Sequence, residues 1–273
     1  MIRDGREDLS GEQGGEAPGG LLVVDVGNTT VQIGSVAGGK AIDTAVVDTA
    51  TLEGLDAMIA PIWDGLDAEQ PRAAVASCVV PEVLGRVIAI VADVTGQELL
   101  VVGKDCALPM PAAVNEPERV GVDRICAAAA AYAELKQACV VTGFGTAIKI
   151  DLVSDDGMFM GGCILPGLHL SALALKEHTA ALPLVEAADA THPWGRDTRE
   201  AISNGLLYGA IGAMREIVER YATETGKWLP LVITGGGCEL IAKHADFVDH
   251  VVPDLTLRGI ALAYHLARGR QDD

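Results

Sequence analysis

The segment that decides the fold of this 273-residue chain is Leu21–Thr30, with the sequence LLVVDVGNTT. A short apolar, β-branched run is followed by a polar turn and then by the alternating residues Val31–Ile33, the pattern of two strands joined by a hairpin. Downstream, apolar runs typical of strands alternate with segments of helical spacing. This alternation predicts an α/β fold. We expect further strands at residues 40–47, 72–79, 98–102, 138–141, 147–153, 158–165 and 229–234, and helices at 52–63, 81–94, 124–136, 168–178, 198–225 and 255–267.

The turn after the first strand carries groups that suit a phosphorylated ligand. Gly27 permits a tight turn whose successive N–H groups can surround an anion, and the hydroxyls of Thr29 and Thr30 can donate to phosphate oxygens. Asp25 ends the strand at this turn, where a carboxylate can hold Mg²⁺ directly or through water. An ordinary hairpin, in which Asp25 and Asn28 satisfy local N–H groups, is an alternative. Neither a Walker A pattern nor a G-x-G-x-x-G after a strand occurs, which disfavours P-loop and Rossmann folds.

A second copy of the hairpin pattern follows in the other half of the chain. The segments Val23–Thr29 (VVDVGNT) and Val141–Ala147 (VTGFGTA) both place a glycine-containing turn between an apolar strand and an alternating strand. Two α/β lobes that each begin in this way would put a phosphate-binding turn on both walls of a cleft. The sequence therefore favours a nucleotide-binding protein.

Two further segments are candidates for chemistry. Asp123, in the segment Gly121–Arg124 before an alanine-rich helix, can accept a hydroxyl proton, and Arg124 can bind a carboxylate with two parallel hydrogen bonds. Alternatively, Asp123 only satisfies N–H groups and complements the dipole at the helix N-terminus. Gly235–Gly237 follows a strand and precedes a helix, where backbone can lie against a nucleotide. A plain turn explains these glycines equally well.

Composition excludes several partners. With 20 Lys and Arg against 38 Asp and Glu, the formal net charge is −18. Nucleic acids and anionic bilayers need clustered basic residues, so we expect neither as a partner. No apolar stretch approaches the length of about 20 residues that spans a bilayer. The acidic, glycine-rich residues 1–20 predict a disordered tail.

The cysteines and histidines lack the spacings of metal or disulfide sites. Six scattered cysteines with apolar neighbours predict buried free thiols in a cytoplasmic protein. The six histidines are isolated and show no ligand spacing. We therefore expect no protein-bound zinc.

In their order, nine motifs resemble those of the type III pantothenate kinases, members of the acetate kinase, sugar kinase, heat-shock chaperone and actin superfamily. The similarity covers about residues 21–266. It implies an α/β fold of two RNase H-like (actin-like ATPase) lobes, each a five-stranded mixed sheet with flanking helices, here residues 21–120 and 121–273. The motifs are DVGNTT (Asp25–Thr30), SCVVP (Ser77–Pro81), GVDR (Gly121–Arg124), FGTA (Phe144–Ala147), GGCILPGL (Gly161–Leu168), TAALP (Thr179–Pro183), GRDT (Gly195–Thr198), TGG (Thr234–Gly236) and DLTLRG (Asp254–Gly259).

The resemblance also implies roles for individual residues. ATP would be contacted by the second turn through Thr146, and Asp123 would be the proton acceptor. Asp25 would in addition hold Mg²⁺. The residues expected to bind the ATP phosphates on the first turn are Asp25, Gly27, Asn28, Thr29 and Thr30. Those expected around pantothenate are Gly121, Val122, Asp123, Arg124 and Thr198.

The chain departs from the family at the second turn. There the family usually reads DFGTATT, and the Asp holds a monovalent cation, K⁺ or NH₄⁺. Here Gly143 replaces this Asp, and Ile148 and Lys149 replace the two threonines. By the period of two, Lys149 faces away from the apolar side chains of the strand. We hypothesise that its ammonium replaces the cation; alternatively, Lys149 is a solvated residue paired with Asp151.

The expected function is the ATP-dependent phosphorylation of pantothenate, the first step of coenzyme A synthesis, by a cytoplasmic homodimer. In-line phosphoryl transfer needs mainly positioning and charge neutralisation, which these residue types supply. Two alternatives are a non-catalytic homologue that acts as a regulator or binding protein, and a kinase of the same fold for another small hydroxylated acceptor.

Overall fold

The structure is a computed structural model that describes residues 20–37, 39–69 and 71–269. Apart from Gly20, the expected disordered tail lies outside these residues. The described residues divide into two compact units. One contains residues 20–136, 157–159 and 254–269, and the other contains residues 137–156 and 160–253. We describe each unit separately.

The first unit is built on a five-stranded mixed sheet in the order β3-β2-β1-β4-β5. Its antiparallel part joins β1 (Leu21–Val26), β2 (Thr30–Ala37) and β3 (Lys40–Asp48). On the other edge of β1 lies the parallel strand β4 (Ala73–Cys78), which pairs with β5 (Leu99–Val101). The central strand β1 is therefore hydrogen-bonded along both edges.

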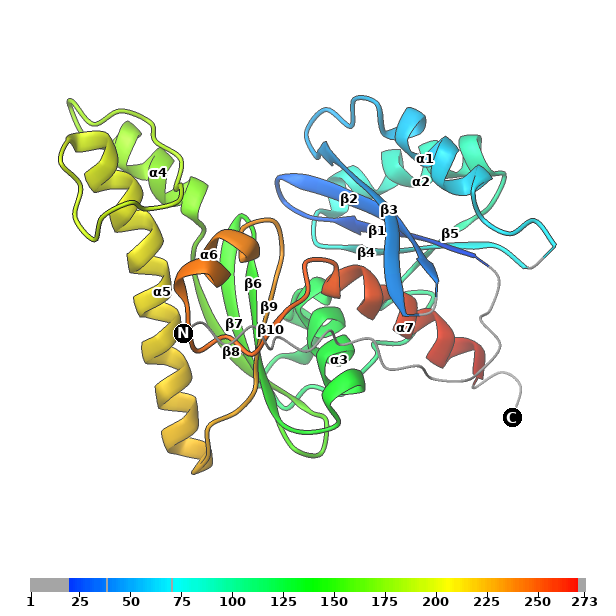
Figure 1. The fold of residues 1–273 in the computed structure, drawn as a ribbon. Coiled ribbons are helices and arrows are strands. Elements are labelled where there is room, and N and C mark those ends of the chain that lie inside the picture. The colour runs from blue at the N-terminus through cyan, green and yellow to red at the C-terminus, as the bar shows by residue number, and fades with distance from the viewer. Residues whose placement is uncertain (1–19, 38, 70, 270–273) are drawn as a thin grey trace. The chain divides into compact units, whose positions relative to one another are not determined.

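Helices cover both faces of this sheet (Figure 1). Leu22 and Val24 of β1 are buried in a cluster with residues of α1 (Leu55–Asp64) and α2 (Pro81–Thr95). The alternate residues Leu21 and Val23 are buried against the opposite pair of helices. This pair consists of α3 (Val122–Leu135), which follows a 3₁₀ turn at Pro117–Arg119, and α7 (Leu255–Gly269). Strand β1 is apolar on both faces because both are covered.

The second unit repeats this plan. Its strands are β6 (Cys139–Phe144), β7 (Ala147–Val153), β8 (Phe159–Pro166), β9 (Leu231–Thr234) and β10 (His250–Val251), and its helices are α4 (Leu168–Glu177), α5 (Thr198–Thr225) and α6 (Cys238–His244). The sheet order β8-β7-β6-β9-β10 corresponds to β3-β2-β1-β4-β5 in the first unit. Helices α5 and α6 pack on one face of this sheet. The predicted α/β class with two five-stranded mixed sheets is confirmed.

The compact units do not follow the expected division between residues 120 and 121. Helices α3 and α7 are grouped with the first sheet, because α7 buries Leu257 and Ile260 against β1. The division into lobes at residues 21–120 and 121–273 stays a prediction. The elements with expected bounds lie close to them. Sequence patterns set no bounds for α6, the short helix after Gly235–Gly237, and missed β10, which has only two residues.

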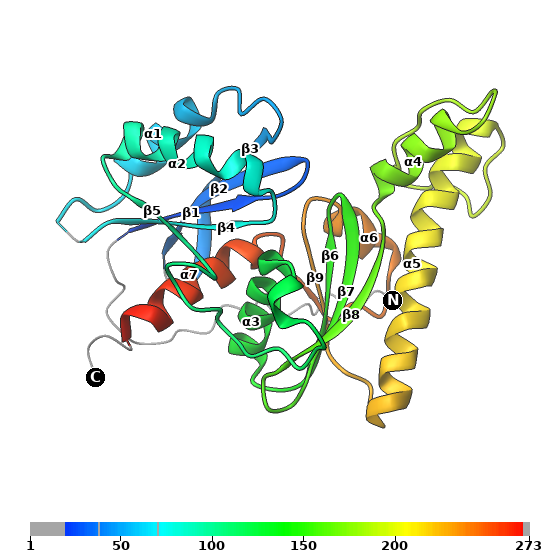
Figure 2. The ribbon, with the colours of Figure 1, turned by 180° about the vertical axis from the view of Figure 1, so that it is seen from behind.

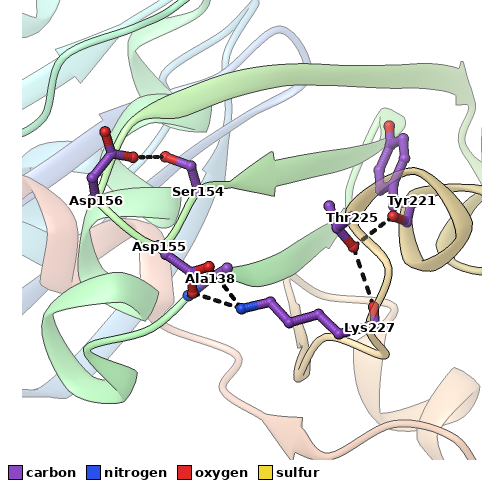
Figure 3. A network of polar contacts seen from close by, with 7 residues as sticks. All are labelled: Ala138, Ser154, Asp155, Asp156, Tyr221, Thr225 and Lys227. Atoms are coloured by element: carbon purple, nitrogen blue, oxygen red, sulfur yellow. Dashed lines mark hydrogen bonds and ion pairs between the residues drawn. The ribbon is translucent and has the colours of Figure 1, made fainter.

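A polar network holds the turn after β7 (Figure 3). The Asp155 carboxylate accepts hydrogen bonds from Lys227 Nζ at 2.7 and 2.8 Å and from the N–H of Ala138 at 3.2 Å. The hydrogen bond from Lys227 lowers the pKa of Asp155, an exposed group. In the same network, Thr225 Oγ1 donates to the carbonyl of Tyr221 at 2.8 Å. These contacts join the ends of β7 and α5.

The six cysteines are free thiols. Four of them, Cys106, Cys126, Cys139 and Cys238, are buried. Burial raises the pKa of Cys139 to about 12 and that of Cys126 well above its usual value. The prediction of free thiols is confirmed, although Cys78 and Cys163 are only partly buried. No helix in the described part of the chain is long and apolar enough to cross a membrane.

We expect this burial to control thiol labelling. Because only an accessible thiolate reacts, the four buried cysteines should resist an aromatic disulfide reagent in the native protein at about pH 8. Burial also raises the pKa of Cys106, Cys126 and Cys139, which keeps their thiolates scarce. At most the two partly buried thiols, Cys78 and Cys163, should react quickly, and all six should react in denaturant. Rapid native labelling of four or more would contradict the packing described here.

Candidate active site

The first predicted phosphate turn is held rigidly by the end of β3. The N–H of Gly27 donates to the Thr30 carbonyl at 3.0 Å, and the N–H of Thr49 donates to the Thr29 carbonyl at 2.9 Å. Thr49 Oγ1 also donates to the Gly27 carbonyl at 2.8 Å, from a side chain that is buried. Asn28, Thr29 and Thr30 are exposed. The turn thus presents its polar side chains outward from a fixed backbone.

Asp25 stands next to Ser77 across the parallel pair of β1 and β4. Ser77 is fully buried, and its Oγ donates to Asp25 Oδ1. This hydrogen bond orients a carboxylate that is itself partly exposed. The sequence offered Ser77 only as part of a motif, without a role. Its position at the end of the neighbouring parallel strand is the signal that could have identified it.

Asp123 lies in the first turn of α3. A Cβ added to Gly121 would lie 2.6 Å from Asp123 Oδ1 and 3.7 Å from Val79 Cγ1. The carboxylate therefore folds back over Gly121, beside the residues that follow β4. A Cβ at position 121 would make the Asp123 carboxylate shift, so Gly121 leaves room for this side-chain conformation.

Besides burial, the negative charges of Asp25 and Asp123 both raise the pKa of one thiol, that of Cys126. The pKa of Cys126 is raised mainly by burial, and then by the negative charges of Asp25 and Asp123. Cys126 is one helical turn after Asp123 in α3. The tertiary structure thus brings residues almost 100 positions apart to the same region of the first unit. Such a pair can place a metal-binding carboxylate near a proton acceptor.

Arg124 is held by an aromatic ring. Its guanidinium carbon lies 5.2 Å from the centroid of the Phe159 ring, and Phe159 is fully buried. A cation over the face of an aromatic ring is stabilised by the ring quadrupole. Phe159 was not among the residues expected at the site. It fixes the direction of Arg124, which is partly exposed.

The second turn is shorter than expected. The expected strands at 138–141 and 147–153 leave five residues between them, but β6 continues through Phe144, so only Gly145 and Thr146 connect β6 to β7. The N–H of Gly167 donates to the Thr146 carbonyl at 3.0 Å, and a Cβ on Gly167 would lie 2.2 Å from the Gly145 carbonyl oxygen. A Cβ on Gly235, which has a φ of +88°, would lie 2.5 Å from the Phe144 carbonyl oxygen. These two glycines allow the segments that follow β8 and β9 to pack against the turn.

Gly143 and Lys149 are directly opposite in the β6–β7 pair. Opposite residues of an antiparallel pair project to the same face, with Cβ positions about 5 Å apart. Ile148 and Ile150 are buried in the core against α5 and α6, so Lys149 projects away from that core. The expected alternation of this strand is confirmed. Asp151, two residues further on the Lys149 face, is a buried carboxylate, which the sequence offered only as a partner of Lys149.

Thr198 is the first residue of α5 and is exposed. The preceding Asp197 caps this helix, because its carboxylate accepts a hydrogen bond from the N–H of Glu200 at 2.9 Å. A pocket of about 320 Å³ lies beside this helix end, between Trp194 and Arg199, but it is lined by none of the predicted site residues. Thr146, Lys149 and Thr198 belong to the second unit, whereas Asp25 and Asp123 belong to the first.

The described residues include no group of three or more His, Cys, Asp or Glu side chains that could hold a metal ion. A divalent ion here would need oxygen ligands from a bound phosphate and from water in addition to protein. Mg²⁺ is usually bound in this way in phosphoryl-transfer sites. The partly exposed carboxylate of Asp25, beside the hydroxyls of the first turn, fits that pattern.

Solved structures show the class of fold. The chain is similar to a Campylobacter jejuni protein described as a conserved putative Baf family transcriptional activator, with a TM-score of 0.57, 17% identity, and coverage of 91% of this chain and 99% of that chain. It is also similar to the ethanolamine utilization protein EutJ of Carboxydothermus hydrogenoformans, with a TM-score of 0.51, 18% identity and 90% coverage of both chains. At these identities the similarity concerns the fold alone.

The sequence comparisons show the family. Residues 21–220 match the family described as type III pantothenate kinase. The chain is 33% identical to the type III pantothenate kinase of Myxococcus xanthus over 89% of its own length and 97% of the relative. It is also 33% identical to that of Geobacter sulfurreducens, over 91% and 99% of the two chains. The chain belongs to the type III pantothenate kinase family, a family of enzymes, so the predicted family and enzyme class are confirmed.

Proposed function

We propose that this protein transfers the γ-phosphoryl group of ATP to the primary hydroxyl of pantothenate, the first step of coenzyme A synthesis. The observation that carries this proposal is the match of residues 21–220 to the type III pantothenate kinase family. Within this segment Asp25 ends the strand before a phosphate turn, next to β4, and the Asp123 carboxylate lies beside Val79, which follows β4. In-line phosphoryl transfer requires positioning and charge neutralisation more than covalent chemistry. A carboxylate beside a phosphate turn and a second carboxylate as proton acceptor meet these requirements.

The first turn is proposed to bind the ATP phosphates. Exposed Asn28, Thr29 and Thr30, on a backbone fixed by Thr49, can donate hydrogen bonds to phosphate oxygens. Asp25, oriented by Ser77, is the proposed protein ligand of Mg²⁺. When bound, Mg²⁺ neutralises charge on the phosphates. Gly27 allows the turn, and Thr146 on the second turn is proposed to contact ATP as well.

The acceptor is proposed to bind at the start of α3. Asp123 would accept the hydroxyl proton, and Gly121 leaves the space that its carboxylate occupies. Arg124, held over Phe159, would bind the pantothenate carboxylate. Val122 and Thr198 would complete the acceptor contacts.

Lys149 is proposed to supply the positive charge that a monovalent cation provides in relatives with an acid at position 143. Two observations support this role: Lys149 lies directly opposite Gly143, and both project to one face of the hairpin. A Cβ on Gly143 would meet only Thr234 Cγ2, at 3.8 Å, an ordinary contact distance, so the backbone at position 143 does not itself require glycine. The alternative is an ordinary strand lysine near Asp151.

We also propose that the protein is a cytoplasmic homodimer. The support for this is the family resemblance. The alanine-rich face of α3 does not add support, because Cys126–Ala131 are buried within the chain, where α3 packs along α7. The small side chains of this helix therefore serve an internal contact.

The proposed function is tested by measuring ADP release with purified protein, ATP and Mg²⁺, with and without pantothenate. Pantothenate should stimulate release strongly, and short sugars or acetate should not. Preference for another hydroxylated acceptor would support a different kinase activity. Binding of ATP or pantothenate without turnover in any monovalent cation would instead support the non-catalytic regulator.

We expect Asp123→Asn to lower kcat by about 10²–10⁴-fold, because the amide preserves shape but cannot accept the proton. ATP binding and the far-ultraviolet circular dichroism spectrum should hardly change. Glu118→Gln, an exposed acid-to-amide change just before α3, is the matched control and should leave kcat unchanged. A kcat within a few-fold of wild type would remove Asp123 from the mechanism, and unfolding of the variant would favour the helix-capping role.

We expect Asp25→Asn to raise the apparent KM for MgATP by roughly 10–100-fold, the usual effect of losing one interaction with a charged group. A neutral amide cannot balance the charge of the metal ion. The measurement is a Mg²⁺ titration of activity at fixed ATP. Asp43→Asn, on the exposed part of β3, is the control. Superimposable titrations of Asp25→Asn and wild type would show that Asp25 only shapes the turn.

We expect wild-type activity to be nearly equal in Na⁺, K⁺ and NH₄⁺ at constant ionic strength, because the positive charge is covalently attached. Lys149→Thr should lose activity, whereas Lys176→Thr, on the exposed side of α4, should not. Adding Gly143→Asp to Lys149→Thr should restore activity that depends on K⁺. Strong activation of the wild type by K⁺ or NH₄⁺, or a fully active Lys149→Thr, would contradict the role of Lys149.

A further inference from the structure

The motif DLTLRG at Asp254–Gly259 has no role in the proposed chemistry. Its charged residues, however, form hydrogen bonds with each other and with β3. Asp254 Oδ2 accepts hydrogen bonds from the N–H of Ala41 in β3 at 2.8 Å and from Arg258 Nε at 2.9 Å. Arg258 Nη2 also lies 2.9 Å from Asp254 Oδ1, and these two side chains are only 13% and 14% exposed. This largely buried ion pair attaches the first turn of α7 to the edge of the sheet.

Gly259, one residue further, is where α7 meets α3. A Cβ on Gly259 would lie 1.9 Å from the carbonyl oxygen of Cys126, 2.3 Å from its carbonyl carbon and 2.8 Å from its Cα. Real Cβ atoms do not approach other atoms within 3.0 Å. The obstacle is helix backbone, which cannot rotate away as a side chain can. Figure 2 shows α3 and α7 side by side.

This contact lies one helical turn from Asp123. Residues three apart in a helix share a face and move together, so a displacement of α3 at Cys126 also displaces Asp123. We infer that Gly259 is a positioning residue: because it lacks a side chain, α3 can approach α7 closely enough to place the Asp123 carboxylate for catalysis. The inference rests on the proposed function, because it acts through Asp123.

Helix propensity predicts the opposite result from this inference. Gly259 is in the interior of α7, where alanine is intrinsically the better residue, so local preference alone predicts that Gly259→Ala is harmless or stabilising. The close approach predicts that α3 must shift by about 1 Å or more, since contacts below 3.0 Å are not tolerated. A shift of this size at a reacting group costs about 10²-fold in rate.

The test is a double-mutant cycle in the full-length protein. Gly259→Ala should lower kcat by about 10–10²-fold with the KM for ATP within about twofold of wild type. Combined with Asp123→Asn, it should cause little further loss, because both changes remove the same contribution. Gly269→Ala, at the other end of α7 with no atom within 4 Å of the new Cβ, is the matched control and should retain wild-type kcat.

Three outcomes decide the inference. A wild-type kcat in folded Gly259→Ala would overturn it. It would also be overturned if the double variant lost the product of the two single fold-losses, because Gly259→Ala would then act independently of the Asp123 carboxylate. If Gly259→Ala does not fold, Arg258→Gln is the deciding variant. It loosens the attachment of α7 to the sheet, so it should lower kcat several-fold at unchanged KM. An unchanged kcat in Arg258→Gln would overturn the inference. Wild-type protein inactive with pantothenate would instead contradict the proposed function itself.

Discussion

The pairing of β1 along both of its edges is the constraint on which the rest of the first unit depends. Each of its six residues has a partner in β2 and another in β4. Because the strand cannot shift without breaking both ladders, the turn that follows Val26 has a fixed position. The same register brings Asp25 to Ser77, whose hydroxyl orients the carboxylate. Backbone pairing in the core thus sets the direction of a side chain at the surface.

The second unit uses the same strand order with different chemistry. Where the first hairpin has Asp25 beside Ser77 on the parallel neighbour, the second has Gly143 beside Thr234. The carboxylate is missing there, and Lys149 stands on the strand opposite. The same strand order therefore carries a negative charge at the first hairpin and a positive charge at the second. This is tolerated because neither Gly143 nor Lys149 contributes to the core that α5 and α6 cover.

Several glycines of this chain are explained by close approaches between backbones. A Cβ on Gly162, Gly167, Gly195 or Gly259 would lie within 2.5 Å of the main chain of another segment. With few aromatic residues, the chain packs its elements closely through such positions. Their distribution determines how near each helix can lie to its neighbour, and at Gly259 this distance also governs the position of Asp123.

The sequence by itself determined the alternation of strands and helices, the two hairpin turns and the family, because period-two and helical patterns and ordered motifs are local properties of the chain. It also indicated Asp25, Asp123 and the departure at Gly143. Only the tertiary structure decided that Ser77 orients Asp25, that Arg124 rests on Phe159, and that α3 and α7 pack on the first sheet. These contacts join residues far apart in sequence, and their distances depend on sheet register and helix packing, which no local pattern specifies.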